Sequence, residues 1–187
     1  MPSLGDDTEG SIDDFLKDLN MKLTIKEKTV ETLARTVQLL NKTNQFTCNG
    51  IRVTEESLSE SLEKNSRIFG ATLTDDGGNH GEVLSLLVDA VGNIQNFAMS
   101  CRVFQRYVEY VFFDWLINTI NPITSISYHQ TERNEPFQLF LKKLSASGQF
   151  SLTTELGRTA LPQDTLQSND FLIKKREFMS IETNISS

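Results

Sequence analysis

The chain has few of the residues that build cross-links, metal sites or membrane spans. Its 187 residues include only two cysteines, Cys48 and Cys101, whose different contexts do not suggest a disulfide framework. The two histidines and two cysteines are widely scattered and show no ligand spacing, so we expect no metal site. No apolar run approaches the ~20 residues that a bilayer span needs. These absences argue against a disulfide-rich secreted domain and predict a reducing, cytoplasmic location.

Positive charge is also in short supply. The net charge of −7 argues against nucleic acid and against an anionic membrane surface as partners. The segment Met1–Gly10 is acidic and polar, with neither a basic nor a hydrophobic region, so we expect a disordered tail over residues 1–10 and no secretory signal. Twelve phenylalanines, by contrast, can supply a sizeable core.

Hydrophobic periodicity and capping residues predict the elements of the first half. Met21–Lys26 alternates apolar and polar residues, which is typical of a half-buried strand. Thr29 begins a helix that places Val30, Leu33, Val37 and Leu40 on one face. Further predicted elements are a helix over Ile12–Leu19, capped by Ser11, an extended piece at Ile51–Val53, and a helix opened by Thr54 with Leu58 and Leu62 inward.

The middle of the chain predicts a meander. Asp76–Asn79 and Gly92-Asn93 are turn sequences, and the nearly all-apolar Val83–Val88 between them indicates a central strand. The remaining predicted elements are strands over Arg67–Leu73 and Ile94–Cys101, a doubly buried helix from Gln105 to about Ile120, a strand over Ile123–Tyr128, a helix from Asn134 or Glu135 to Leu144, and a short strand over Phe150–Thr153. From Glu155 onward we expect a docked strand at best and otherwise a mobile tail.

The amide-rich run after the second predicted helix is the most distinctive motif. Gln38–Phe46 reads QLLNKTNQF, and because Asn and Thr are poor helix formers it predicts a specific hydrogen-bonded corner. This run resembles the QLxNKTNQFN signature in the C-terminal region of FkbH-like proteins. Three further segments resemble that family in the same order: Asn79-His80-Gly81 its GDHG turn, Met99–Glu109 its MSCRVLGRGVE segment, and Tyr128, Thr131, Asn134 and Pro136 its Tyr-x-x-Thr-x-x-Asn-x-Pro element.

The resemblance implies an α+β fold of the GNAT acyltransferase type, which the predicted element order also matches. This is a mixed, mostly antiparallel sheet with a central meander and helices on both faces, here over residues 11–153, followed by a partly mobile extension over 154–187. In that fold the third meander strand and the next strand splay apart, and an acyl-CoA or acyl-pantetheine arm lies between them. Its pyrophosphate meets the N-terminus of the intervening helix. We therefore expect a slot between segments ending near Ser100 and beginning near Ile123.

Two departures from the family limit what can be carried over. Full FkbH-like proteins load a glyceryl unit with a DxDxT-like aspartate motif and Mg²⁺, and this motif is missing here: Asp13-Asp14 and Asp75-Asp76 lie at a helix start and in a turn. The GNAT pyrophosphate loop, R/Q-x-x-G-x-G/A, keeps Arg102 but has Gln105 and Tyr107 at the two glycine positions. Glycine lets the backbone approach phosphate oxygens without a Cβ in the way, so the cradle is altered.

Candidate site residues follow from the resemblance, each beside a plainer interpretation. Tyr128 is a candidate general acid or a packed aromatic, Cys101 a nucleophile or a buried apolar group, and His80 a base or a solvated turn residue. Glu109 is expected to face solvent, and His129 has no partner we can name. The candidate cofactor-binding residues are Met99, Ser100, Cys101, Arg102, Val103, Gln105, Arg106, Tyr107 and Asn134, for acetyl-CoA or a phosphopantetheine thioester.

Three functions stay open at this point. The chain is either a degenerate GNAT-like module that binds an acyl carrier protein, a pantetheine arm or a partner enzyme, or an active acyltransferase that uses an acyl-CoA or acyl carrier protein thioester. The missing glycines favour the first, and the retained Arg102, Tyr128 and Asn134 support the second. The third is a structural dimerisation domain, suggested by the apolar helix over 105–120. Nucleic acid and membrane are not expected as partners, and the oligomeric state is open.

Overall fold

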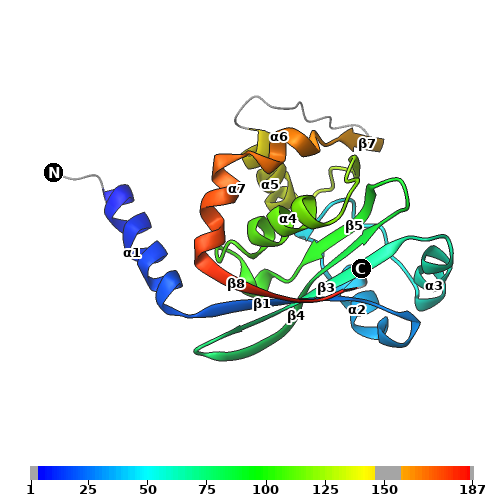
Figure 1. The fold of residues 1–187 in the computed structure, drawn as a ribbon, viewed down its shortest axis with the longest axis horizontal. Helices are drawn as coiled ribbons and strands as arrows, with labels where there is room; N and C mark the ends of the chain where they lie inside the picture. Colours follow the sequence, from blue (N-terminus) through cyan, green and yellow to red (C-terminus); the bar gives the residue numbers. More distant parts are fainter. Residues whose placement is uncertain (1–3, 146–156, 186–187) are drawn as a thin grey trace.

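The chain folds around one mixed β-sheet, seen in a computed structural model that describes residues 4–145 and 157–185 (Figure 1). The fold class is α+β, as predicted. The strands are β1 (Met21–Glu27), β2 (Phe46–Thr47), β3 (Arg67–Asp75), β4 (Gly78–Val88), β5 (Asn93–Met99), β6 (Ser125–Tyr128), β7 (Gly157–Ala160) and β8 (Met179–Asn184). The helices are α1 (Leu4–Asp18), α2 (Ala34–Lys42), α3 (Glu55–Glu63), α4 (Val108–Thr119), α5 (Glu135–Ser145), α6 (Gln163–Gln167) and α7 (Asp170–Lys175), with 3-10 turns η1 (Val30–Thr32), η2 (Cys101–Val103) and η3 (Arg176–Phe178).

The strand order is β7-β6-β5-β4-β3-β1-β8, and β2 adds to the end of β5. The pairs within β3-β4-β5 are antiparallel, which confirms the meander and the central position of β4. The β5–β6 and β1–β8 pairs are parallel. The turn between β3 and β4 is tighter than predicted, because Asp75 pairs with Gly78 and leaves only Asp76-Gly77 between the strands.

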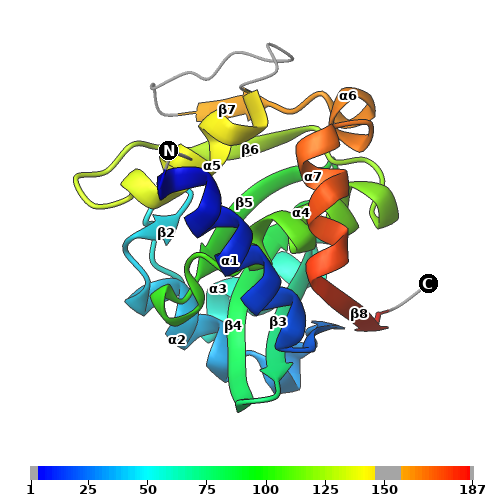
Figure 2. The ribbon, with the colours of Figure 1, turned by 90° about the vertical axis from the view of Figure 1, so that its left-hand side faces the viewer.

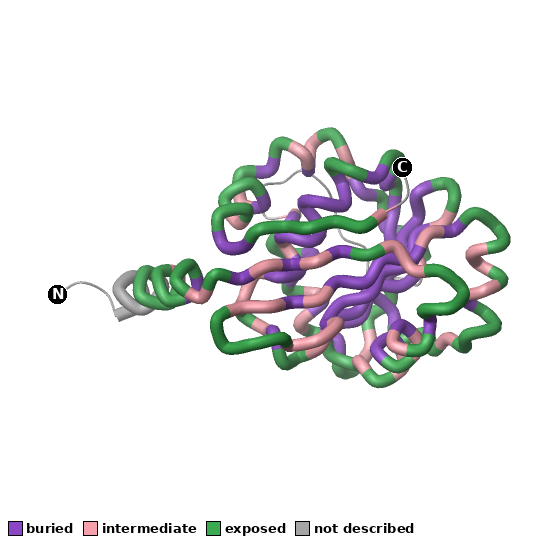
Figure 3. The backbone as a smooth tube through the Cα atoms, turned by 60° about the horizontal axis from the view of Figure 1, so that its bottom comes forward, coloured by how far each residue is buried: buried purple, intermediate pink, exposed green. Residues whose placement is uncertain are grey.

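Helices cover both faces of the sheet (Figures 1 and 2). On one face α4, α5, α6 and α7 pack over a large aromatic and aliphatic core, whose buried backbone path is visible in Figure 3. On the other face α2 and α3 cover a smaller cluster of Leu33, Leu58, Ile68 and Leu87. The alternation of adjacent residues such as Ile68 and Phe69 between the two clusters follows from the two-residue period of a strand.

The N-terminal helix begins earlier than the sequence suggested. Helix α1 starts at Leu4, whereas we expected a disordered tail over residues 1–10 and a helix capped by Ser11. Once a helix has nucleated, each added residue gains one hydrogen bond at little further cost, so a helix can extend beyond its apolar stretch. Residues 1–3 lie outside the described part of the chain.

The predicted extended piece at Ile51–Val53 does not form a strand. The short strand β2 forms instead at Phe46–Thr47, where the amide run ends. The side chain of Asn41 accounts for the difference, because it donates to Val53 O and accepts from Val53 N, both at 2.7 Å. These two bonds satisfy the Val53 backbone without a neighbouring strand.

The C-terminal segment supplies strands to the same sheet, as the docked-strand alternative predicted. Strand β7 pairs with β6, and β8 pairs in parallel with β1, so that Met21 lies opposite Met179. Leu161, Leu166 and Leu172 are buried in the main core, where they help to enclose α4. The predicted strand over Phe150–Thr153 and the predicted boundary after residue 153 fall outside the described residues.

Helix α4 is held by polar contacts from the C-terminal segment as well. Asp114 is buried and accepts two hydrogen bonds from Arg176, at 2.7 and 2.9 Å. Gln163 donates to Ile117 O at the end of the same helix. Because the chain itself encloses both sides of α4, the apolar surface that suggested a dimerisation domain is not available to a second copy. Across the residues that the structure describes, every helix is too short or too polar to cross a bilayer.

Candidate functional site: the β5–α4 loop and the cavities beside it

The loop from β5 to α4 carries most of the predicted cofactor-binding residues. The Ser100 amide donates to Val83 O at 2.7 Å, which fixes the loop to β4 at its start. The Ser100 hydroxyl accepts from the Arg102 amide and so caps η2. Cys101 therefore begins a 3-10 turn rather than ending the strand, and this cysteine is exposed. Val103, in contrast, is fully buried.

The two residues at the expected glycine positions adopt a glycine-like backbone. Gln105 and Tyr107 have φ angles of 66° and 68°, in the left-handed region that costs an ordinary L-residue roughly 1–2 kcal/mol. Both residues thus adopt a backbone conformation for which glycine is best suited.

Gln105→Gly should therefore stabilise the protein, by roughly 0.5–1 kcal/mol, because it removes the left-handed strain of an exposed residue whose side chain forms no hydrogen bond among the described residues. Gln105→Ala is the matched control, since it removes the side chain but keeps the Cβ that causes the strain. Urea unfolding at constant m-value measures both variants. A glycine variant no more stable than the alanine variant would show that position 105 is unstrained.

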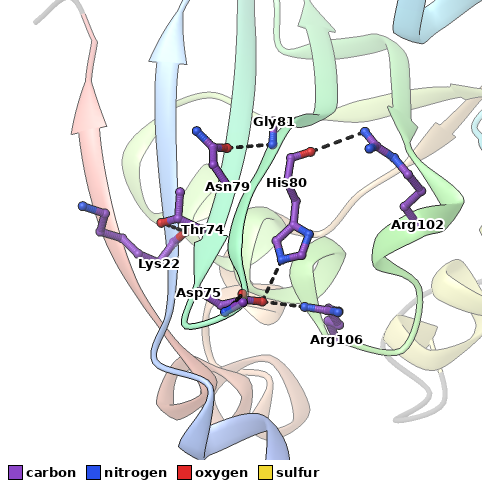
Figure 4. Close-up of polar contacts among 9 residues, drawn as sticks. Lys22, Thr74, Asp75, Asn79, His80, Gly81, Arg102 and Arg106 are labelled. Carbon is purple, nitrogen blue, oxygen red and sulfur yellow. Dashed lines mark hydrogen bonds and ion pairs between the residues drawn. The ribbon is translucent and has the colours of Figure 1, made fainter.

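Polar contacts tie the loop to the β3–β4 hairpin (Figure 4). Asp75, at the end of β3, accepts from Arg106 at 2.7 Å and contacts His80 Nε2 at 2.8 Å. Arg102 reaches the His80 carbonyl at 3.4 Å. Burial by itself raises the pKa of Asp75, but the hydrogen bonds from His80, the Gly77 amide and Arg106 outweigh it and hold the pKa below its usual value. Arg106 is thus committed to Asp75 and bridges the loop to the hairpin.

Tyr107 ties the same loop to both ends of the chain. Its hydroxyl donates to Asp13 Oδ1 in α1 at 2.8 Å. Its ring packs against Phe178, with the centroids 4.7 Å apart, and Lys175 Nζ lies 4.0 Å from the Tyr107 ring centroid. Tyr107 therefore fixes the loop against α1 and the C-terminal segment.

The predicted divergence of the two strands is present, but the chain itself fills it. Strands β5 and β6 pair only at Asn93–Ser125 and Ile94–Ile126. Beyond these pairs β2 takes the place of β6 beside β5, with Phe46 opposite Met99 and Thr47 opposite Ala98. The expected open slot between Ser100 and Ile123 is therefore wrong: segment 46–49 lies where an extended ligand would pair with β5.

Segment 46–49 is held from both sides. The Cys48 amide donates to Phe97 O in β5, and the Cys48 carbonyl accepts from the His129 amide just after β6, at 3.0 and 2.9 Å. Asn49 donates to both Gln95 O and Ser127 O, each at 2.9 Å. This one amide therefore spans the gap between β5 and β6. Burial also raises the pKa of the Cys48 thiol to about 12, which makes it inert.

Asn134, from the family-like Tyr-x-x-Thr-x-x-Asn-x-Pro element, belongs to the same clamp. It is fully buried and donates to Thr47 O and His129 O at 3.0 and 2.9 Å. Its side-chain oxygen accepts from the Thr131 amide and from Gln138. Both donors are in use, so Asn134 holds β2 in place and has no N–H left for a cofactor.

The two longest family-like motifs meet in one cavity of about 330 Å³. The end of α2 and the amide run supply one wall, and Met99–Arg102 supply the other. Arg35, Lys42 and Arg102 bring positive charge to it, and none of its lining residues is an Asp, Glu, His or Tyr. The lining residues are Arg35, Gln38, Leu39, Lys42, Thr43, Asn44, Gln45, Met99, Ser100, Cys101 and Arg102. We call it the motif cavity.

No protein-family model, curated protein or solved structure matches this chain.

The three candidate catalytic residues lie in different surroundings. Cys101 lines the motif cavity. His80 lies beside Asp75 in the hairpin. Tyr128 is only 3 % exposed and stacks on Phe137 in the aromatic core, where burial raises its pKa. Within the part of the chain that the structure describes, no hydrogen bond joins any two of these side chains. The same part of the chain holds no group of three or more His, Cys, Asp or Glu that could bind a metal.

The sequence analysis missed two side chains that shape this region. Asn49 follows the amide run, and its role as a bridge between β5 and β6 depends on contacts 46 and 78 residues away in sequence. Glu109 was expected to face solvent but is only 7 % exposed. Helix α4 is apolar on nearly every side, so hydrophobic periodicity could not identify its outer face. A charged residue inside so apolar a helix was the one available signal.

Proposed function

We propose that the chain is a GNAT-like domain, resembling the C-terminal region of FkbH-like proteins, that binds the phosphopantetheine arm of an acyl carrier protein or of coenzyme A without transferring the acyl group. The observation that carries this proposal is the meeting of the QLLNKTNQF and MSCR motifs in the walls of one cavity. The first motif ends at Phe46 and the second begins at Met99, so 52 residues of sequence separate them. A ligand bound in this cavity contacts both motifs, which explains why both occur in the sequence.

The charge of the motif cavity supports an anionic ligand. Arg35 has one guanidinium nitrogen on Gln38 and another on the Glu82 carbonyl, so it is held in place without being neutralised by these partners. Lys42, in the last turn of α2, is exposed and forms no ion pair among the described residues. Arg102 completes the group. Guanidinium and ammonium groups are the side chains that bind phosphate oxygens best.

Two features support binding over acyl transfer. Transfer to or from a thioester needs a nucleophile next to a general base, but among the described residues Cys101 shares the motif cavity with no His, Asp, Glu or Tyr. The space between β5 and β6, where a GNAT enzyme holds the thioester, is occupied by segment 46–49. An active acyltransferase is therefore the less favoured alternative, and the exposure of Cys101 is the observation that supports it.

The test is thermal unfolding with coenzyme A and, separately, with an acyl carrier protein in its holo and apo forms. A ligand at one hundred times its dissociation constant should add about 2.7 kcal/mol to the free energy of unfolding. We expect coenzyme A and the holo carrier to stabilise the protein and the apo carrier, which lacks the arm, to do so less. Lys42→Glu should weaken both effects at least tenfold in affinity, because it reverses one of the cavity's charges.

Lys174→Glu is the matched control, because Lys174 is an equally exposed lysine in α7, outside the motif cavity. It should leave coenzyme A and carrier binding unchanged. The proposal is wrong if neither ligand stabilises the protein, or if both lysine variants weaken binding equally, which would indicate a non-specific charge effect.

A further inference from the structure

A second cavity, on the α1 and α5 side of the β5–α4 loop, shares no lining residue with the motif cavity. It has a volume of about 400 Å³ and most of its walls are apolar. Phe46, Phe104, Tyr110 and Phe140 contribute aromatic rings, and Ile12 and Leu139 contribute aliphatic surface from α1 and α5. Ile12 and Leu139 are 45 % and 53 % exposed, so the apolar walls continue to the mouth of the cavity. We call it the Glu109 cavity.

The described lining contains two acidic residues, Glu109 and Asp13. Glu109 is 7 % exposed, and among the described residues its carboxyl group pairs with no cation and accepts from no side chain. Asp13, the other acid in the lining, accepts the Tyr107 hydroxyl. Among the residues that the structure describes, no Lys, Arg or His lines the cavity. Lys175 lies over the ring of Tyr107, a lining residue, and also contacts the Phe171 and Phe178 rings.

Burying an ionised carboxyl group without a cation costs free energy, and protonation of the carboxyl group avoids this cost. Burial raises the pKa of Glu109 to about 8, while its own backbone amide, at the first turn of α4, partly offsets the effect. Asp13, Tyr107 and Tyr110 are the other titratable groups facing it, and the α5 and β2 walls contribute none. A cation that entered the cavity would replace the proton as the partner of the carboxylate.

We propose that the Glu109 cavity binds an organic amine: a cation with an apolar or aromatic body, whose ammonium group pairs with Glu109 while its body lies among the Phe46, Phe104 and Phe140 rings. The lining contains a partner for the ammonium group and apolar surface for the body of the ligand. Carboxylates and aromatic faces attract ammonium groups, and the apolar walls exclude water from the pair. An anionic ligand is disfavoured, because Glu109 itself occupies the positive end of the α4 dipole and Asp13 adds further negative charge.

The test compares three ligands of matched size by isothermal titration calorimetry: 4-phenylbutylamine, 4-phenylbutanol and 4-phenylbutyrate. We expect the amine to bind at least about tenfold more tightly than the alcohol, as is typical of a charge-assisted bond in a dry site, and the carboxylate to bind least. Titrations in buffers of different ionisation enthalpy should show close to one proton released on binding the amine near neutral pH. They should show almost none released well above the Glu109 pKa.

Variants assign the effect to Glu109. Glu109→Gln keeps the size of the side chain and should abolish both the amine preference and the proton release, while the alcohol still binds and so reports an intact cavity. Asp13→Asn is the control and should retain the proton release, because Asp13 is bonded to Tyr107. Equal affinities for the amine and the alcohol, tighter binding of the carboxylate, or no binding of any of the three would overturn the proposal. None of these outcomes bears on the motif cavity.

Discussion

Replacing Phe46 by alanine should lower the free energy of unfolding by about 3–5 kcal/mol, the largest effect that we expect from a single truncation in this chain. Phe46 is 2 % exposed, and its ring meets those of Phe97, Phe137 and Phe140 at centroid distances of 4.8–5.4 Å. These three rings come from β5 and α5, so the loss would remove the contact that joins β2 to the main core. Guanidinium or urea unfolding at unchanged m-value measures the change.

Phe15→Ala is the matched control. Phe15 lies on α1, is 62 % exposed, and should cost less than about 0.5 kcal/mol when truncated. If Phe46→Ala were equally mild, β2 would not be a packed part of the sheet, and the space between β5 and β6 would be free for a ligand. The comparison therefore tests whether the chain fills its own slot.

Glu109→Gln should change how stability depends on pH, with the second-largest effect. The pKa of Glu109 is about 8 in the folded protein, against a reference value of 4.5. Between these values the folded state holds a proton that the unfolded state has lost, so the free energy of unfolding falls as pH rises, by up to about 1.4 kcal/mol per pH unit. The contribution is complete below the unfolded pKa and is lost as pH rises through about 8.

The glutamine variant lacks this titration, so its stability relative to the wild type should increase across that pH range and then level off. Urea unfolding at a series of pH values measures the difference. Glu132→Gln, at an exposed position, should run parallel to the wild type and serves as the control. Asp75 cannot imitate the effect, because its pKa is lowered and its contribution is lost only as pH falls into the acid range. A constant offset between Glu109→Gln and wild type would contradict the burial of the Glu109 carboxyl group.

Elements with a strong local signal could be predicted from the sequence. The alternation at Met21–Lys26 gave β1, the turn residues Asp76-Gly77 gave the β3–β4 hairpin, and Thr54 gave the start of α3, where its hydroxyl accepts from the Ser57 amide as a capping residue should. In each case the residues that decide the structure are near neighbours in sequence, so propensity and packing agree.

Elements that depend on distant contacts could not be predicted. Strand β2 has only two residues, too few to show a period, and it forms because Asn49 and Asn134 hold it between β5 and β6. Strand β8 exposes most of its side chains and is placed by the burial of Leu172 and Phe178 just before it. In the candidate site, the fold brings two of the family-like motifs to one cavity. Neither the filled slot nor the burial of Glu109 has a local signature.

A crystal structure of the protein with coenzyme A tests most directly whether the motif cavity binds the ligand. We expect a phosphate of coenzyme A in the motif cavity, within hydrogen-bond reach of Lys42 and Arg102, with segment 46–49 still paired to β5. A pantetheine arm lying between β5 and β6, with segment 46–49 displaced and the pyrophosphate at the N-terminus of α4, would contradict it. That result would point to a working acyltransferase site in place of a binding module.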